Sequence, residues 1–179
     1  MIDEYLTTIN DLLLSTNSWM IKDMPIQEKP VSLDSHYKFP EGYDDLVNED
    51  LASLALKLGS WRSYLLVETS KAENNKRLLK EKYGYIYNQT LAQELYRILK
   101  EVTNVNGKVN VRAYEIGERL GQEIIKNTPE VLKSYTELEV NEINLHQLHA
   151  MTDILKIQEE TLSREISRRQ TDARTIGRM

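Results

Sequence analysis

One stretch of the chain combines basic and aromatic side chains in a way that suits an unpaired nucleic-acid strand. Its members are Lys71, Lys76, Arg77, Lys80, Lys82, Tyr83 and Tyr85, with Tyr87 following. Basic groups neutralise phosphates, and aromatic rings stack on unpaired bases. The pattern therefore predicts a single-strand binding surface. The plainer alternative is a solvated helix face with tyrosines in the core.

A second basic group lies near the C-terminus at Arg164, Arg168 and Arg169. Residues 164–179 hold five arginines against two acids, whereas residues 1–56 hold eleven acids and three bases. Arginines near the end of a helix are favoured by its dipole, which accounts for part of this excess. Contact with phosphates and pairing with the acidic arm of a neighbouring subunit both remain open.

Catalytic patterns are missing from the sequence. It contains no cysteine, no Gly-x4-Gly-Lys-Ser/Thr loop and no Gly-x-Gly-x-x-Gly motif. Glu142, His146, His149 and Asp153 could share one side of a helix, but two histidines on a polar helix are more often surface or interface residues. We therefore predict a non-enzymatic protein without metal or cofactor.

The composition favours long solvated helices. The 179 residues are 28% charged, include one Phe and four Pro, and carry a net charge of −5. No apolar run reaches the ~18 residues that span a bilayer. The N-terminal residues also lack the basic segment and apolar stretch of a secretory signal. We expect a soluble, cytoplasmic, all-α protein that does not bind membranes.

Residues 1–45 are expected to form an N-terminal helix and an arm. Ile2, Leu6, Ile9 and Leu13 follow helical spacing through about residue 14. Three prolines without periodicity then indicate an extended arm over residues 23–42.

Residues 46–169 are expected to form a helical core, with a basic tail over 170–179. The core should be a long hairpin of two long helices joined by a shorter one. The first should start near Asp44 to Asn48, run to about Lys100 and carry an apolar stripe. That stripe comprises Leu51, Leu54, Leu58, Trp61, Leu65, Ala72, Leu79 and Ile86.

The connection to the second long helix contains Asn106-Gly107, which fits either a small β-hairpin or a loop, and we favour the loop. Asn110 should cap a short helix whose inward residues are Ala113, Ile116, Leu120 and Ile124. Thr128 should cap the last helix, with Pro129 at its first position. Its stripe comprises Leu138, Leu145, Leu148, Thr152, Leu155, Leu162 and Ile166.

The stretch from Leu51 to Tyr87 resembles the phage recombination mediator family UvsY. The similarity rests on Trp-Arg-Ser-Tyr-Leu at 61–65, Ala-Glu at 72–73 and Leu-Lys-Glu-Lys-Tyr at 79–83. The Ser-Arg-Glu-Ile-Ser-Arg-Arg run at 163–169 is similar to the end of such proteins, and the resemblance covers about residues 46–170.

The resemblance implies a ring-like homo-oligomer that binds single-stranded DNA. Its partners would be a single-strand binding protein and a RecA-type recombinase, which it helps to load in the host cytoplasm during phage infection. The family's basic pair beside an aromatic pair corresponds to Lys80 and Lys82 with Tyr83 and Tyr85. A lysine replaces the family's arginine at 82, which keeps the charge but loses bidentate geometry. The alternative function is a phage scaffold, assembly factor or inhibitor that binds proteins.

Overall fold

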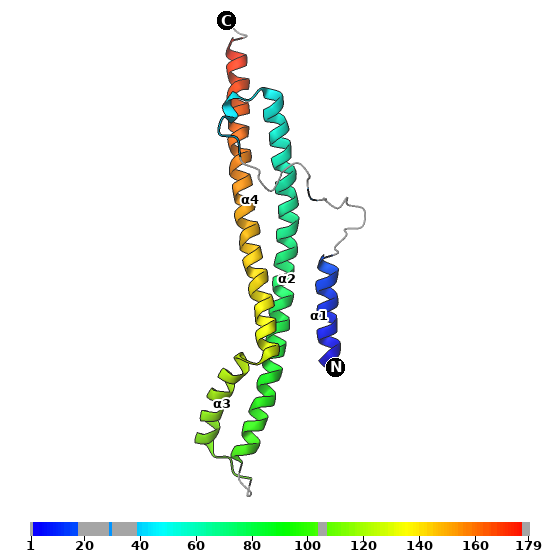
Figure 1. Ribbon diagram of the computed structural model, residues 1–179, viewed down its shortest axis with the longest axis vertical. Coiled ribbons are helices and arrows are strands. Elements are labelled where there is room, and N and C mark those ends of the chain that lie inside the picture. Colours follow the sequence, from blue (N-terminus) through cyan, green and yellow to red (C-terminus); the bar gives the residue numbers. More distant parts are fainter. Residues whose placement is uncertain (1, 18–28, 30–38, 104–106, 177–179) are drawn as a thin grey trace. The chain divides into compact units, whose positions relative to one another are not determined.

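The computed structural model describes residues 2–17, 29, 39–103 and 107–176. In these ranges it contains helices α1 (Ile2–Asn17), α2 (Asn48–Val102), α3 (Val111–Lys126) and α4 (Pro129–Ile176), a 3-10 turn η1 (Tyr43–Asp45) and one isolated β-bridge (Figure 1). The expected all-α class and the long helical hairpin are confirmed. Most of the expected arm at 23–42 lies outside the described residues.

The boundaries of the helices follow their local sequence signals. The first turn of α2 carries Glu49 and Asp50, which suit the positive end of the helix dipole. Pro129 occupies the first position of α4, where its missing N–H has no helical partner to lose. The Thr128 hydroxyl donates to the carbonyl of Ile124 and does not cap the first turn of α4. That cap was expected from the sequence and is absent. The last helix also runs seven residues past Arg169 and includes most of the expected tail.

A short connection leads from α2 to α3. Gly107 has a φ of 74°, a conformation that glycine adopts without steric cost. Thr103 and Val109 form a single antiparallel bridge, so the expected loop contains one β-type pairing. The Asn110 side chain accepts a hydrogen bond from the N–H of Ala113 at 3.2 Å, which confirms the expected cap of α3.

The chain divides into two compact units, to both of which α2 and α4 contribute. In the unit formed by residues 19–71 and 144–179, Leu51, Leu58 and Leu65 of α2 pack with Leu155 and Leu162 of α4. These side chains are at most 8% exposed, and full burial of each stabilises the fold by ~1.5–3 kcal/mol. The expected stripes therefore do form the seam of the hairpin in this unit.

A polar layer interrupts this leucine seam. Arg62 donates from Nη1 to Oε2 of Glu159 at 2.7 Å, with both side chains partly buried. Gly59 leaves room for that carboxylate, since a Cβ there would lie 3.3 Å from Oε1 of Glu159. Glu159, which lies between Leu155 and Leu162 of the α4 stripe, is therefore paired across the seam, and this pairing disfavours slipped registers of the two helices.

The other unit comprises residues 1–18 and 72–143. Within it α2 and α4 are antiparallel, because Lys76 pairs with Glu142 at 3.0 Å and Lys82 with Glu137 at 2.8 Å. The Asn141 amide donates to the carbonyl of Ala72 at 2.9 Å. Helix α1 buries Ile9, which is 2% exposed.

Two sequence expectations about buried faces are wrong in this unit. On α2 the buried leucine is Leu78 and not Leu79. Leu78 lies two turns before Tyr85, on the side of α2 where the ring of Tyr85 packs against Tyr5 of α1. A seven-residue pattern read along α2 alone could not anticipate the helix that covers this side.

On α3 the expected inward residues Ile116, Leu120 and Ile124 are 55–61% exposed. Gly121 and Ile125 are buried instead, and a Cβ at Gly117 would lie 2.7 Å from Cγ2 of Ile98. The glycines let the α3 backbone approach α2, and this close approach turns the large apolar residues outward.

Candidate nucleic-acid interface

Ion pairs within the chain engage three of the five bases of the central cluster. Lys71 pairs with Glu68 at 2.7 Å, and Lys76 and Lys82 pair with glutamates of α4. Arg77 and Lys80 are exposed and have no ion pair in the part of the chain that the structure describes. These two residues are therefore the strongest phosphate-binding candidates in this stretch.

The tyrosines of the cluster lie on two different sides of α2. The ring of Tyr83 lies 6.0 Å from that of Tyr87 and 5.7 Å from that of Tyr135 on α4. The ring of Tyr85 lies 4.8 Å from that of Tyr5 on α1. Residues two positions apart on an α-helix point about 200° apart, so Tyr83 and Tyr85 cannot share a surface.

The basic residues divide in the same way. Lys76, Lys80, Tyr83 and Tyr87 follow spacings of four, three and four residues and lie along one side of α2. Lys82 lies on the side of Tyr85 and lines a polar groove of about 400 Å³ together with Leu6 of α1. The structure thus brings Lys80 together with Tyr83, and Lys82 with Tyr85, but does not join the two pairs.

We use the name tyrosine face for Lys76, Lys80, Tyr83, Tyr87 and Tyr135. The Tyr135 hydroxyl donates to Glu139, and this bond raises the pKa of Tyr135. Lys126, at the end of α3, is close enough to Tyr83 and Tyr87 for them to contribute to its raised pKa, although its ion pair with Glu123 is the main cause.

Sequence reasoning missed Tyr135 as a member of the tyrosine face and Lys126 as a neighbour of it. Tyr135 lies far from the cluster along the chain and joins it only through the register of α2 against α4. The pairing of Lys82 with Glu137 and of Lys76 with Glu142 fixes that register. No local signal in the sequence could have identified Tyr135.

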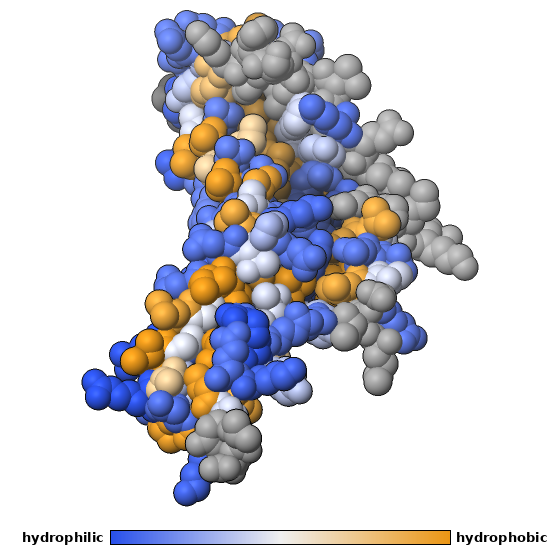
Figure 2. All heavy atoms as spheres, turned by 60° about the horizontal axis from the view of Figure 1, so that its bottom comes forward, coloured by the Kyte–Doolittle hydropathy of each residue, from blue (hydrophilic) through white to orange (hydrophobic). Residues whose placement is uncertain are grey.

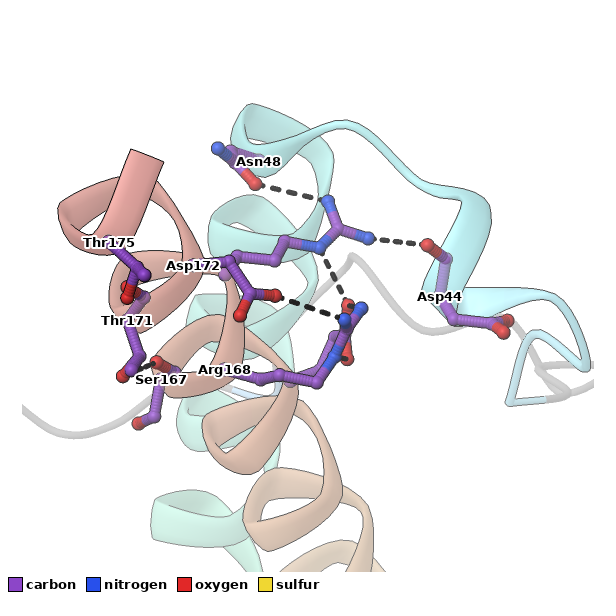
Figure 3. Close-up of polar contacts among 9 residues, drawn as sticks. Asp44, Asn48, Ser167, Arg168, Thr171, Asp172 and Thr175 are labelled. Atoms are coloured by element: carbon purple, nitrogen blue, oxygen red, sulfur yellow. Dashed lines mark hydrogen bonds and ion pairs between the residues drawn. The ribbon is translucent and has the colours of Figure 1, made fainter. Parts of the chain in front are cut away.

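The C-terminal arginines differ sharply in their surroundings. Arg164 has an 83% exposed side chain and its nearest acid, Glu160, lies 3.8 Å away. Arg168 binds Glu165 and Asp172 (Figure 3). Arg169 binds Glu165 and donates to the backbone carbonyls of Leu46 and Asp44. The Arg168 side chain is 60% exposed but engaged by two carboxylates, and that of Arg169 is 21% exposed, so Arg164 is the most available of the three arginines.

Glu165 is the centre of this arginine group. It is 8% exposed and accepts hydrogen bonds from Arg168 and Arg169. These bonds lower the pKa of Glu165 to about 2 and raise that of Arg168. The carboxylate therefore stays charged at neutral pH and holds both arginines against α4.

Two further observations concern other kinds of site. Among the described ranges, no three His, Asp or Glu side chains come together as a metal site would require, and Glu142 is engaged by Lys76. None of the described helices combines the length and apolar character needed to cross a membrane.

No protein-family model, curated protein or solved structure matches the chain.

Proposed function

We propose that this protein is a non-catalytic single-stranded DNA-binding protein of the recombination-mediator type. The observation that carries the proposal is the tyrosine face, where three rings from two helices contact one another. Lys80, which has no ion pair in the described chain, lies one turn from Tyr83 on the same side of α2. Tyrosine rings can stack on bases of any sequence while the lysine neutralises a phosphate. Such a surface suits an unpaired strand better than a duplex, whose bases are already stacked.

The mediator role is proposed from the sequence resemblance of about residues 46–170 to UvsY-like proteins. In this proposal the protein holds the strand extended while a RecA-type recombinase replaces the single-strand binding protein, in the host cytoplasm during phage infection. No bond is made or broken. Each tyrosine face binds weakly, because Lys76 is already paired with Glu142, and several copies along one strand supply the avidity.

A ring-like assembly of several copies is part of the same proposal. Met151, Ile154 and Ile157 of α4 are 54–63% exposed, which leaves apolar surface that a single copy does not cover. Contiguous exposed apolar residues on a helix commonly mark an interface.

The test is binding to a single-stranded oligonucleotide over a salt series. Lys80→Gln should weaken binding. It should also reduce the slope of log affinity against log salt by the amount that corresponds to about one phosphate contact. Lys82→Gln is the matched control on the other side of α2, and it should change the salt dependence little because Lys82 is already paired with Glu137. Equal effects of the two substitutions, or no binding by the parent protein, would contradict the proposal.

The second candidate is a helical scaffold or inhibitor that binds protein partners and not DNA. It is favoured over DNA binding by the net charge of −5, which repels a nucleic-acid strand, and by the glutamates that already engage Lys76 and Lys82. A protein that binds no oligonucleotide at low salt, yet assembles normally, would support this candidate.

A further inference from the structure

Helix α3 presents its large apolar residues to solvent. Ile116, Leu120 and Ile124 are 55%, 61% and 58% exposed and succeed each other at four-residue spacing. We call these three residues the α3 ridge. Apolar side chains reach the surface in this part of the molecule, at the lower left of Figure 2.

The orientation of the ridge is fixed because the adjacent side of α3, which carries Gly117 and Gly121, packs against α2. A Cβ at Gly121 would lie 3.0 Å from Cδ1 of Ile98, and one at Gly117 would come closer still. Burial of Ile125, which is 1% exposed, and the Asn110 cap hold the two ends of the helix. Turning α3 to bury the ridge would remove the glycines from Ile98, so the exposure follows from the fold.

We propose that the α3 ridge binds the α3 ridge of a second copy, with the two helices antiparallel about a two-fold axis at Leu120. The order Ile-Leu-Ile reads the same in both directions, so this axis places Leu120 on Leu120 and Ile116 on Ile124. Ridges of four-residue spacing are the surfaces by which helices most often interlock. A contact of this kind is isologous and buries the same patch on both copies.

The charges beside the ridge favour the antiparallel arrangement. Arg112 and Arg119 flank its N-terminal half, and Glu123 flanks its C-terminal half on the same side. An antiparallel partner places its Glu123 beside these arginines, whereas a parallel partner would turn its Glu123 to the opposite flank. Arg119 has no ion pair within the described chain, and Glu123 is bound only by Lys126 there.

This contact is separate from the proposed DNA site. It joins two copies and does not by itself close a ring, which would require a second, head-to-tail interface. Loss of the contact should therefore halve the mass of the assembly, whether that assembly is a dimer or a larger even-numbered oligomer. DNA binding by each tyrosine face is measured independently.

The experiment is light scattering of the full chain over a range of concentrations. The parent protein should have a mass that is an even multiple of 20.9 kDa, and Leu120→Glu should halve it. Val111→Glu is the control, because Val111 is 65% exposed on the opposite side of the same helix and should leave the mass unchanged. Circular dichroism verifies that each variant keeps its helices.

Charge exchange tests the antiparallel geometry. Arg119→Glu and Glu123→Arg should each raise the dissociation constant about tenfold, and the double exchange should restore it to within about threefold. A parent mass of one chain at every concentration would overturn the proposal. The proposal would also be overturned if the mass of the Leu120→Glu assembly were anything other than half that of the parent. The same holds if Val111→Glu lowered the mass as much, or if the double exchange did not restore the dissociation constant.

Discussion

Arg169 and Glu165 lie one turn apart on α4, and Nε of the arginine donates to Oε1 of the carboxylate at 2.7 Å. The rest of the guanidinium bonds to the carbonyl of Asp44 and to the Asn48 side chain, where α2 begins (Figure 3). It also donates to the carbonyl of Leu46. An arginine that sequence alone assigns to a phosphate site thus joins the end of α4 to the start of α2.

Replacing Arg169 by Gln should destabilise the fold by about 1.5–3 kcal/mol, because its charged hydrogen bonds to buried Glu165 and to the part-buried carbonyl of Leu46 are lost. Arg164→Gln should change stability by less than about 0.5 kcal/mol, since Arg164 is 83% exposed and only loosely paired. Urea unfolding followed by circular dichroism measures both. Equal stabilities of the two variants would show that Arg169 does not hold the start of α2.

Substitution of the same two arginines should affect DNA affinity to different extents. If the tail takes part, Arg164→Gln should weaken binding to an oligonucleotide by more than Arg169→Gln does, because the Arg169 guanidinium is already occupied within the chain. Fluorescence anisotropy at fixed salt gives the comparison. The reverse order would mean that the arginine is released from Leu46 when DNA binds.

Glu165 should make stability depend on pH in the acid range. Its pKa of about 2 lies below the ordinary value of 4.5, so the unfolded chain binds more protons between these pH values. The stability that Glu165 contributes is present above pH ~4.5 and is lost as the pH falls toward 2. Denaturant unfolding at several pH values should show the parent protein more stable than Glu165→Gln at pH 7, with the difference shrinking toward pH 2. A difference that stays constant would contradict this assignment.

Two glycines should respond to alanine in opposite directions. Gly117→Ala places a Cβ 2.7 Å from the Cγ2 methyl of Ile98 and should cost about 1–3 kcal/mol through overpacking. Gly84→Ala meets nothing within 4 Å in the interior of α2 and should stabilise by about 0.5–1 kcal/mol through helix propensity. Thermal melts of the two variants decide the matter. Stabilisation by both would mean that α3 does not pack closely on α2.

The split of the tyrosines gives a direct test of the DNA site. Tyr83→Leu removes a ring of the tyrosine face and should weaken oligonucleotide binding by about 1–3 kcal/mol, the usual contribution of one stacked base. Tyr85→Leu removes a ring that packs on Tyr5 and should affect stability more than binding. Titrations with a homopolymeric strand, together with a melt of each variant, separate the two effects. Stronger loss of binding in Tyr85→Leu would move the site to the side of α1.

The sequence by itself determined the helices and most of their limits. Pro129 occupies the first position of α4, where its missing N–H costs nothing, and the Asn110 side chain caps α3 by accepting from the N–H three residues on. The leucine seam of the hairpin also follows from spacing along each helix, because a helix must bury its apolar stripe. All of these depend on residues that are neighbours in the chain.

Only the tertiary structure decided which side chains remain available. On α3 a row of small residues lies beside a row of large apolar ones, and contact with Ile98 selects the small row for packing. The register of α2 against α4 pairs Lys82 with Glu137 and adds Tyr135 to Tyr83. The backbone carbonyls that engage Arg169 belong to residues more than 120 positions away. A periodic pattern gives the direction of each side chain from its own helix, but burial and pairing depend on the surfaces that folding brings opposite it.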